Sequence, residues 1–474
     1  MRGSAGPVRD RKAWAKTAIM SVALISVCGG AMAATTSRPP APGAGSAGAT
    51  APAVWPAYLD GPLHQSYSPD ATTITTAKVR RLVMKWKDTL GAPYLASPTV
   101  SDGSVFIGAN TGWFYKLSIS TGKVQAKRFL GQFPVNSCHT AGIENTATVA
   151  SDPVTHKLTV YVGGPDGYVY ALSAAHLAVQ WKSSAVLPAP DYYQWSSPTV
   201  ADSRVYIGVA SNCEQPQVRG GVIAFNQATG KKQAEFYAVP AGQLGGGVWS
   251  TVAVGPGGYV YATTGAGPSG DVRDGHSEAI VKLAPHTLKL DGSWQISGPA
   301  ADYDTDFGAS PVVFGKYVGA CNKDGIFYAV SQATMKLAWQ KRTGAVYNDT
   351  SGAECDGSPA FDGKYLYFAS TGVTIHGVAY QGSVQKRKAS NGKLLWESGL
   401  PEGVTGSPAL DGAGVLAVGT YDNNASRDET YLVNAATGKI LRTLVAGQDF
   451  AQSTFADDQL FTANANGVYG WAVK

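Results

Sequence analysis

A repeated unit restricts the fold of this chain more than any other feature of its sequence. One clear copy spans residues 97–123, and the same order of strand and turn signals returns in 197–231, 358–396 and 407–439. The turns of successive units lie about 46 to 58 residues apart, a spacing typical of the four-stranded units of a propeller. Within each unit, short alternating strands are joined by Gly, Asn and Asp turns, which is the pattern of sheets.

The two ends of the repeated region complement each other. Weaker copies lie in 146–181, 249–294 and 310–339, and only three strand signals remain in 450–474. The segment 81–87 offers the missing fourth strand, and pairing it with the last unit would leave no open sheet edge. We therefore predict an all-β fold: an eight-bladed β-propeller of four-stranded antiparallel blades, with the last blade closed by the N-terminal strand.

The beginning of the chain differs in composition from the repeats. Residues 1–33 have the pattern of a secretory signal peptide, with a basic start, an apolar run over 17–27 and a small-residue cleavage site at Ala31-Met32-Ala33. Residues 34–54 are rich in Pro, Ala, Gly, Ser and Thr, which predicts a disordered linker. The propeller then occupies 55–474, and we expect a secreted or periplasmic protein that is soluble after signal cleavage.

The charge of the chain argues against nucleic acid as a partner. The formal net charge is +5, but residues 1–33 carry five basic side chains against one acidic one, so the remainder is almost neutral. No basic stripe is left for nucleic acid. No second apolar stretch reaches the roughly 18 residues that a membrane-spanning helix needs. We expect a monomer with no membrane span.

Four cysteines follow residue 33. An even number of cysteines in an exported protein favours disulfides, and the sequence alone allows three ways of pairing them. We favour Cys321 with Cys355 and Cys138 with Cys213, because each pair would tie neighbouring units together. No Cys-x-x-Cys-His motif occurs, which excludes covalently attached haem, and the seven histidines show no zinc-ligand spacing.

The candidate functional residues lie between Gly245 and Gly325. A glycine run precedes Trp249, and bare backbone beside an indole suits a planar ligand. Three aspartates follow in 302–306, and Lys323 stands in the turn that ends the stretch. Such groups would project from strand ends, where sites are usually built. The competing interpretation is plain packing and turn chemistry, and paired carboxylates for glycoside hydrolysis are a weaker alternative.

The repeat resembles that of the quinoprotein alcohol dehydrogenase-like family, whose blades carry the motif Ala-x-Asp-x-x-Thr-Gly-x-x-x-Trp. Residues 118–126 keep Thr-Gly without the Trp, 171–181 keep the Trp without Thr-Gly, and 389–396 have Asn-Gly. The opening 55–69 is similar to that of these proteins, and 211–249 looks closest to secreted polyvinyl-alcohol-dehydrogenase-like propellers. The resemblance covers essentially the whole repeated region and implies a PQQ-type propeller.

The family's functional residues have counterparts in this sequence. Trp249 matches the tryptophan on which the flat quinone of PQQ lies, and Lys323 matches the cation that bonds the quinone oxygens. Glu214 matches a glutamate that helps hold Ca²⁺, with one extra residue before Val218-Arg219-Gly220. Asp306 matches the aspartate that acts as base on the alcohol and touches the metal. Hard carboxylate oxygens suit Ca²⁺, and a base near the hydroxyl suits hydride loss.

Three departures from the family pattern leave two functions open. Ala266 replaces an expected metal-binding asparagine, the expected threonine of the third unit is Trp195, and the neighbouring-cysteine disulfide that covers the cofactor is absent. The first function is a PQQ- and Ca²⁺-dependent dehydrogenase that oxidises alcohols or hydroxylated polymers and passes electrons to an external acceptor. The second is a non-catalytic extracellular propeller that acts as a binding or scaffold module for a protein or polysaccharide ligand.

Overall fold

The computed structural model describes ten ranges of the chain: 54–89, 94–132, 142–184, 192–211, 217–267, 275–297, 306–345, 355–421, 429–446 and 451–474. All of them belong to a compact unit that spans Pro52–Lys474. The predicted signal peptide, the predicted linker up to residue 53, and the candidates Glu214, Cys138 and Cys213 lie outside the described residues.

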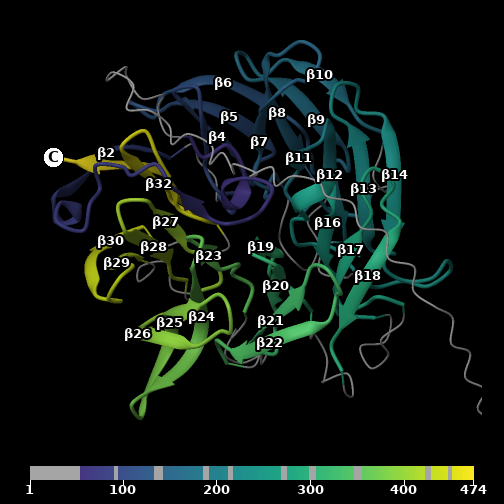
Figure 1. Ribbon diagram of the computed structural model, residues 1–474. Coiled ribbons are helices and arrows are strands. Elements are labelled where there is room, and N and C mark those ends of the chain that lie inside the picture. Colours follow the sequence, from purple (N-terminus) through teal and green to yellow (C-terminus); the bar gives the residue numbers. More distant parts are fainter. Residues whose placement is uncertain are drawn as a thin grey trace, which may run out of the picture. The chain divides into compact units, whose positions relative to one another are not determined.

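Eight sheets make up this unit and follow one another along the chain (Figure 1). The first three contain β3 (Thr99–Ser101), β4 (Ser104–Gly108), β5 (Trp113–Ser118) and β6 (Val124–Phe129); β7 (Thr148–Ser151), β8 (Leu158–Gly163), β9 (Val169–Ser173) and β10 (Val179–Lys182); and β11 (Thr199–Ala201), β12 (Arg204–Val209), β13 (Gly221–Asn226) and β14 (Lys232–Tyr237). The next three contain β15 (Ala253–Val254), β16 (Val260–Thr263), β17 (Ala279–Leu283) and β18 (Leu290–Gln295); β19 (Val312–Phe314), β20 (Tyr317–Cys321), β21 (Ile326–Ser331) and β22 (Leu337–Arg342); and β23 (Ala360–Phe361), β24 (Tyr365–Ile375), β25 (Val378–Lys388) and β26 (Leu394–Leu400). The last two contain β27 (Ala409–Asp411), β28 (Val415–Gly419), β29 (Thr430–Asn434) and β30 (Ile440–Leu444), joined by β1 (Tyr67–Ser68); and β31 (Thr454–Ala456), β32 (Gln459–Asn464) and β33 (Gly467–Val473), joined by β2 (Leu82–Asp88).

Helices contribute little to the described part of the chain. It holds three 3-10 turns, η1 (Tyr58–Asp60), η2 (Val79–Arg81) and η3 (Pro256–Gly258). None of the helices among the described residues has the length and apolar character needed to cross a membrane.

The last sheet is closed by a strand from the beginning of the propeller. β2 pairs antiparallel with β33, with Leu82 opposite Val473 and Asp88 opposite Val468. The predicted eight-bladed propeller with an N-terminal closing strand is therefore confirmed. One sheet is larger than predicted, because β1 adds a fifth strand parallel to β27.

The first strands of the sheets contact one another around the propeller. β3 contacts both β7 and β31, and further contacts join β7 to β11, β11 to β15, β15 to β19, β23 to β27 and β27 to β31. Hydroxyl groups at the beginning of these strands bond to the backbone of the preceding blade. The Oγ1 atom of Thr146 accepts the N–H of Ser97 at 2.9 Å, and equivalent bonds run from Thr146 to Ser197, from Ser197 to Thr251 and from Thr251 to Ser310.

The segment 55–69 ties the inner strands of several blades together. Its carbonyl groups accept backbone N–H bonds from one residue on each of five first strands, β7, β15, β19, β23 and β27. The donors and acceptors are Val149 to Pro56, Val254 to Pro62, Val313 to Leu63, Phe361 to Gln65, and Leu410 to Ser66. The opening of the propeller is thus fixed by contacts with strands that lie far apart in the sequence.

Tryptophan and glycine pair between neighbouring blades. A Cβ atom placed on Gly230 would lie 2.5 Å from Cε3 of Trp181, whose Nε1 donates a 3.0 Å bond to the Gln227 carbonyl. Gly230 has a φ of 68°, the left-handed conformation that glycine adopts without cost. The same packing joins Trp86 to Gly122, Trp339 to Gly392 and Trp396 to Gly438. These are the Gly and Trp of the repeat motif, brought together from consecutive blades.

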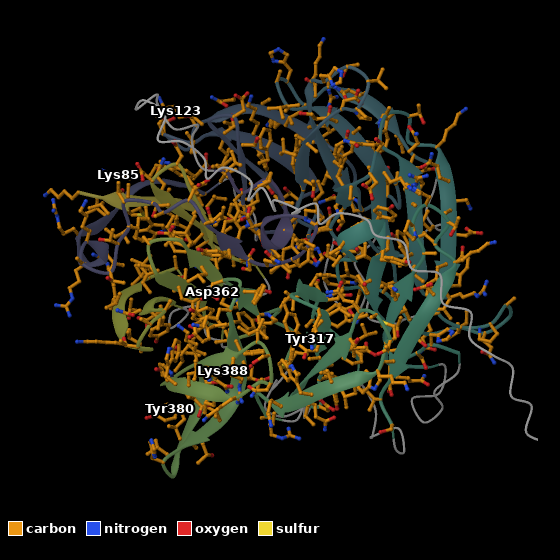
Figure 2. The ribbon with its side chains drawn as sticks, in the orientation of Figure 1. Lys85, Lys123, Tyr317, Asp362, Tyr380 and Lys388 are labelled. Atoms are coloured by element: carbon orange, nitrogen blue, oxygen red, sulfur yellow. A yellow bond between two sulfur atoms is a disulfide. The ribbon has the colours of Figure 1, made fainter. Side chains whose placement is uncertain are left out.

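Where the motif is incomplete, a small residue occupies the tryptophan position of one blade and a large residue occupies the glycine position of the next blade. Ala126 takes the place of the tryptophan and packs against the cluster that contains Leu177, a fully buried residue with a φ of 55°. In the same way, Ala234 packs against the cluster that contains Leu288, and Gly292 lies against Met335. Each of these interfaces therefore combines one large and one small residue, and side chains fill the space between adjacent sheets (Figure 2).

Candidate functional site

Three of the predicted site residues meet where blade 4 (β15 to β18) and blade 5 (β19 to β22) adjoin, with the blades numbered in chain order from β3. Trp249 precedes β15, Asp306 precedes β19, and Lys323 stands in the turn between β20 and β21. The indole Nε1 of Trp249 donates to Asp306 Oδ2 at 3.2 Å, and Lys323 Nζ lies 5.3 Å from the indole centroid. The backbone N–H of Lys323 donates to the Asp306 carbonyl at 3.0 Å. An aromatic face, a carboxylate and a cation therefore share one small region.

Asp306 is held on both of its oxygens. Its side chain is almost fully buried, and Oδ1 accepts the backbone N–H of Ala266 while Oδ2 accepts the Trp249 indole. A Cβ atom on Gly265 would lie 2.9 Å from Asp306 Oδ1, so only glycine allows the backbone to approach this closely. Ala266 thus supplies a backbone donor to the aspartate, although its side chain has no oxygen for a metal.

Asp356 is a fourth member of this group, and no motif in the sequence indicates it. Its carboxylate and Trp249 both crowd Gly308: a Cβ atom there would overlap Asp356 Oδ1 and lie 2.6 Å from Trp249 Cη2. Asp356 stands two residues before Ser358, and Trp249 stands two residues before Thr251, which occupies the same place in its blade. Alignment of the repeats by these hydroxyl residues is the signal that could have found Asp356.

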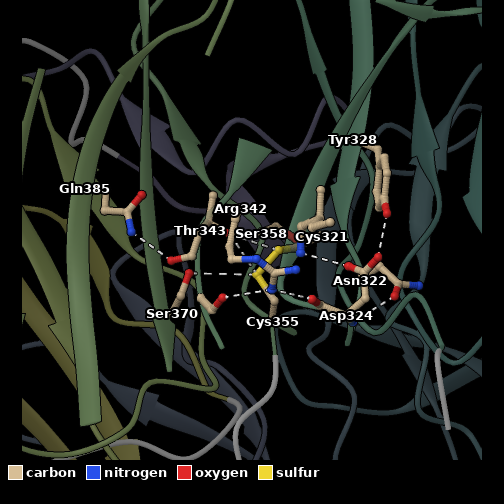
Figure 3. Close-up of a disulfide and its surroundings, with 12 residues drawn as sticks. Cys321, Asn322, Asp324, Tyr328, Arg342, Thr343, Cys355, Ser358, Ser370 and Gln385 are labelled. Carbon is tan, nitrogen blue, oxygen red and sulfur yellow. Dashed lines mark hydrogen bonds between the residues drawn. A yellow bond between two sulfur atoms is a disulfide. The ribbon is translucent and has the colours of Figure 1, made fainter. Parts of the chain in front are cut away.

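A disulfide joins the two loops that carry Lys323 and Asp356. Cys321 and Cys355 are bonded, with 5.5 Å between their Cα atoms, and both are buried (Figure 3). The Thr343 hydroxyl lies 3.3 Å from the first sulfur and 3.2 Å from the second. One of the two predicted pairings is therefore confirmed. Its place between blades 5 and 6 restricts the turn of Lys323 relative to Asp356.

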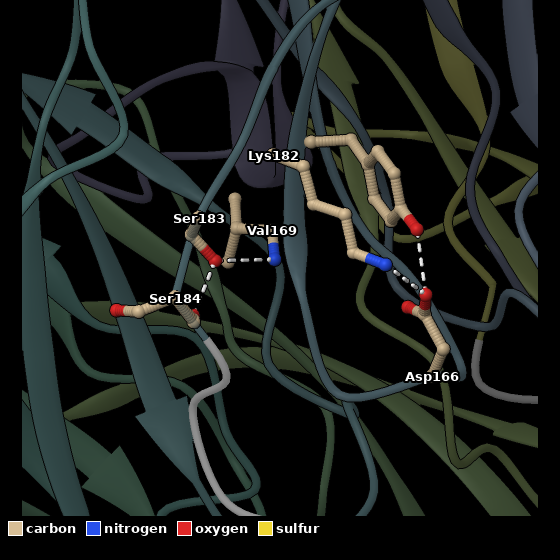
Figure 4. A network of polar contacts seen from close by, with 6 residues as sticks. Asp166, Val169, Lys182, Ser183 and Ser184 are labelled. Atoms are coloured by element: carbon tan, nitrogen blue, oxygen red, sulfur yellow. Dashed lines mark hydrogen bonds and ion pairs between the residues drawn. The ribbon is translucent and has the colours of Figure 1, made fainter.

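The turn of Lys323 also contains a buried aspartate with a structural role. The Tyr328 hydroxyl donates to Asp324 Oδ2, and burial raises the pKa of Asp324 (Figure 3). The corresponding turn of blade 2 has the same bond, from the Tyr170 hydroxyl to Asp166 Oδ2 at 2.6 Å (Figure 4).

The two turns differ in the residue that precedes the aspartate and in the position of the nearest lysine. Burial raises the pKa of Tyr170 to about 12, and Lys182 Nζ forms an ion pair with Asp166 at 3.0 Å. The residue before Asp166 is Pro165, whereas the residue before Asp324 is Lys323. The Asp–Tyr bond is therefore present in both turns. Of these two turns, only that of blade 5 has a lysine, Lys323, before the aspartate.

Tyr58 brings a further hydroxyl to the group from the N-terminal segment. Its oxygen lies 3.3 Å from Ser407 Oγ. Burial raises the pKa of Tyr58, and the nearby charge of Asp356 raises it further, so the phenol stays neutral. Tyr58 lies in the opening segment 55–69, whose sequence pattern assigns no role to this residue.

The described side chains fit a flat anion better than they fit a metal ion. An indole face with an ammonium group 5.3 Å away suits a planar ring with acidic substituents. Within the ten described ranges, no three His, Cys, Asp or Glu residues are grouped so that they could hold a metal. Of the two carboxylates predicted to bind Ca²⁺, Asp306 is described, while Glu214 is outside those ranges.

Comparison with known proteins assigns the family. A family model of PQQ-repeat proteins, described as outer membrane protein assembly factor BamB, matches residues 218–474, which is more than half of the chain. The chain belongs to this family of PQQ-repeat propellers. The predicted resemblance to quinoprotein propellers is therefore confirmed at the level of family and fold.

One curated relative of this PQQ-repeat propeller is the quinohemoprotein alcohol dehydrogenase ADH IIB of Pseudomonas putida. The two are 26% identical over 231 residues, which are 40% of this chain and 33% of the relative. The matched region thus spans about a third of the length of that enzyme.

Solved structures show how widely the fold of this propeller is shared. The quinohemoprotein alcohol dehydrogenase of Comamonas testosteroni matches with a TM-score of 0.71 and 16% identity, over 89% of this chain and 80% of that one. A europium-containing methanol dehydrogenase matches with a TM-score of 0.69 and 15% identity, over 89% and 98%. BamB from Moraxella catarrhalis matches with a TM-score of 0.56 and 14% identity, over 82% and 99%. At these identities the likeness shows the fold alone.

Proposed function

We propose that this protein is an exported PQQ-binding dehydrogenase that oxidises alcohols or hydroxylated polymers. The observation that carries the proposal is the convergence of Trp249, Asp306 and Lys323 at one point between blades 4 and 5. The dehydrogenases with the same fold and the curated alcohol dehydrogenase support it. The signal-like residues 1–33 and the disulfide support export.

Each residue of the group has a role that its chemistry allows. PQQ, when bound, supplies a quinone that accepts two electrons from the alcohol. Trp249 offers a flat face for the ring, and Lys323 places a positive charge over that face. The two N–H donors on Asp306 fix the direction of its carboxylate, which can then accept the hydroxyl proton of an alcohol. Glu214 and Asp306 are the proposed Ca²⁺ ligands.

The electron acceptor and the substrate are also proposals. The sequence has no haem attachment motif, so electrons would leave to a separate acceptor, which a redox dye can replace in an assay. Secreted polyvinyl-alcohol-dehydrogenase-like propellers share the pattern of 211–249, and this makes a polymeric alcohol a substrate to test beside simple alcohols.

Replacement of Asp306 by Asn tests the catalytic role. With PQQ and Ca²⁺ added, Asp306→Asn should retain PQQ binding and lose at least 100-fold in dye reduction, because general-base catalysis contributes roughly that factor. Asp102→Asn is the matched control, since Asp102 is an exposed turn residue with a φ of 49° that asparagine tolerates well. Unchanged turnover in the loaded Asp306→Asn protein would refute the role of this aspartate.

A non-catalytic binding or scaffold module is the second candidate function. Ala266 stands where a metal-binding oxygen is expected, and the family description and the BamB structure concern an assembly factor rather than an oxidoreductase. A protein that binds neither PQQ nor Ca²⁺, and reduces no dye with any alcohol, would favour this function over the first.

A further inference from the structure

A cavity lies between blades 5 and 6, at the end of their strands that is far from Lys323. Its volume is about 530 Å³, within the range of small-molecule sites. It is formed by the turns that join β19 to β20, β23 to β24 and β25 to β26. Strand β20 begins directly after Lys316 at the cavity and ends two residues before Lys323, so the cavity and the Trp249 group are at opposite ends of the blade.

The walls of this cavity are aromatic and held in place by packing. Phe314 and Phe361 are both buried, and their ring centroids are 5.8 Å apart in an edge-to-face arrangement. Phe314 also packs on Tyr317, with centroids 5.6 Å apart. Tyr365 completes the wall from the neighbouring blade. Because these rings are fixed by one another, the cavity needs little rearrangement to receive a flat apolar group.

Three exposed lysines, Lys316, Lys364 and Lys388, are among the residues that line this cavity. Lys316 Nζ is 5.4 Å from the centroid of Tyr317, and Lys364 Nζ is 5.1 Å from that of Tyr365. Among the residues that the structure describes, none of the three forms an ion pair. A positive rim over an apolar floor is complementary to an anion with an apolar body.

The carboxylate closest in sequence to this rim is already bonded within the fold. Asp362 Oδ1 accepts the backbone N–H groups of Lys364 and Tyr365 at 2.9 and 2.7 Å. Its Oδ2 accepts the Tyr367 hydroxyl at 2.9 Å. Lys386 lies over Tyr365 as well, with Nζ 4.2 Å from the ring, and adds a further positive charge. The electrostatic potential at the opening is therefore positive.

We propose that this cavity binds an aromatic carboxylate. The ring would lie against Tyr317 and Tyr365, which the buried Phe314 and Phe361 support, and the carboxylate would face Lys316, Lys364 and Lys388. The size of the cavity limits the ligand to a small molecule or one end group of a larger one. This site is independent of the proposed PQQ site, because it lies at the other end of the blade and uses different residues.

Calorimetric titration with 2-naphthoate tests the proposal directly. The full-length protein should bind one naphthoate, and 2-naphthylmethanol, which has the same ring without the charge, should bind at least tenfold more weakly. The triple variant K316Q/K364Q/K388Q should weaken naphthoate binding at least tenfold. The control K85Q/K123Q/K157Q removes three exposed lysines from other parts of the surface and should change the Kd less than twofold.

Three results would overturn the proposal. The first is no binding of naphthoate at millimolar concentration, and the second is equal binding of the acid and the alcohol. The third is binding that survives K316Q/K364Q/K388Q but is lost in Trp249→Ala, which would place the anion on the indole of the other site. Binding that Trp249→Ala leaves unchanged and the triple lysine variant weakens would support the cavity between blades 5 and 6.

Discussion

The exchange of large and small residues between blades makes a quantitative prediction. Ala126 packs against the cluster that contains Leu177, at the position where other blades pair tryptophan with glycine. Leu177 is fully buried, so the cavity left by Leu177→Gly should lower the free energy of unfolding by about 4 kcal/mol. Leu177 has a left-handed backbone with a φ of 55°, which glycine adopts without strain, so the same change should raise the free energy of unfolding by about 1 kcal/mol. The net loss in the free energy of unfolding is then about 3 kcal/mol.

The partner substitution is destabilising for the opposite reason. Ala126→Trp forces an indole against a leucine, and overpacking of this kind costs about 2 kcal/mol. If the two changes were independent, the double variant would lose about 5 kcal/mol. The double variant instead recreates the packing of Trp181 on Gly230, so we expect it to lie within about 1.5 kcal/mol of the parent protein.

Urea denaturation followed by far-UV circular dichroism measures these differences without interference from the added tryptophan. The control is Ala126→Trp combined with Leu288→Gly, because Leu288 belongs to a different interface and its effect should simply add. If the double variant of Ala126 and Leu177 is as unstable as the sum of its single variants, the size exchange does not determine this interface.

Three other predictions follow from the site and its surroundings. Burial lowers the pKa of His64 to about 4, so the unfolded chain takes up this proton first, and the free energy of unfolding should fall by up to about 3 kcal/mol as the pH drops from about 6.5 to 4. His64→Gln should flatten this pH dependence in urea titrations, and an unchanged slope would exclude His64 as its source. Replacement of Cys321 and Cys355 by Ser should lower the free energy of unfolding by about 3 kcal/mol. It should also weaken PQQ binding, measured by equilibrium dialysis, because the turn of Lys323 is then less restricted. An unchanged PQQ affinity would mean that the disulfide does not restrict the site. Lys323→Gln should weaken PQQ binding about tenfold, as expected for loss of one charge contact worth roughly 1.4 kcal/mol, while Lys85→Gln on the exposed surface should leave it unchanged. Equal affinities of the two variants would remove Lys323 from the site.

The propeller could be predicted because its signals are local and repeated. Each unit shows its own strands and turns, and the absence of a fourth strand after residue 450 required a partner from elsewhere in the chain. The strand 82–88 fills that place, as expected from 81–87. The contacts of the segment 55–69 could not be predicted in the same way, because its partners on β7 to β27 are defined only once the ring has closed.

The incomplete motifs show a second limit of the sequence. Thr-Gly stands without tryptophan at 118–126, and tryptophan stands without Thr-Gly at 171–181, so the motif is incomplete within each of these blades. The structure shows that Ala126 packs with the Leu177 cluster and Trp181 with Gly230, so the residues compensate across blade boundaries. A motif confined to one blade cannot show this, because the relevant pairs belong to two successive blades.

The candidate site was predicted in part. Trp249, Asp306 and Lys323 lie together as the family resemblance implied, and their roles in catalysis are proposals. Asp356 was missed because it has no motif of its own and joins the group only through its place in the repeat and its contact with Gly308. Tyr58 reaches the group from a segment whose path the sequence does not define.

Binding of PQQ is the measurement that tests the central claim most directly. Calorimetric titration of PQQ into the protein, with and without Ca²⁺, should show one site per chain. Trp249→Ala should abolish that binding, and Trp113→Ala, which changes a tryptophan on β5 of blade 1, should leave it intact. Absence of binding at millimolar PQQ and Ca²⁺, or equal binding by both variants, would contradict the assignment of a PQQ site between blades 4 and 5.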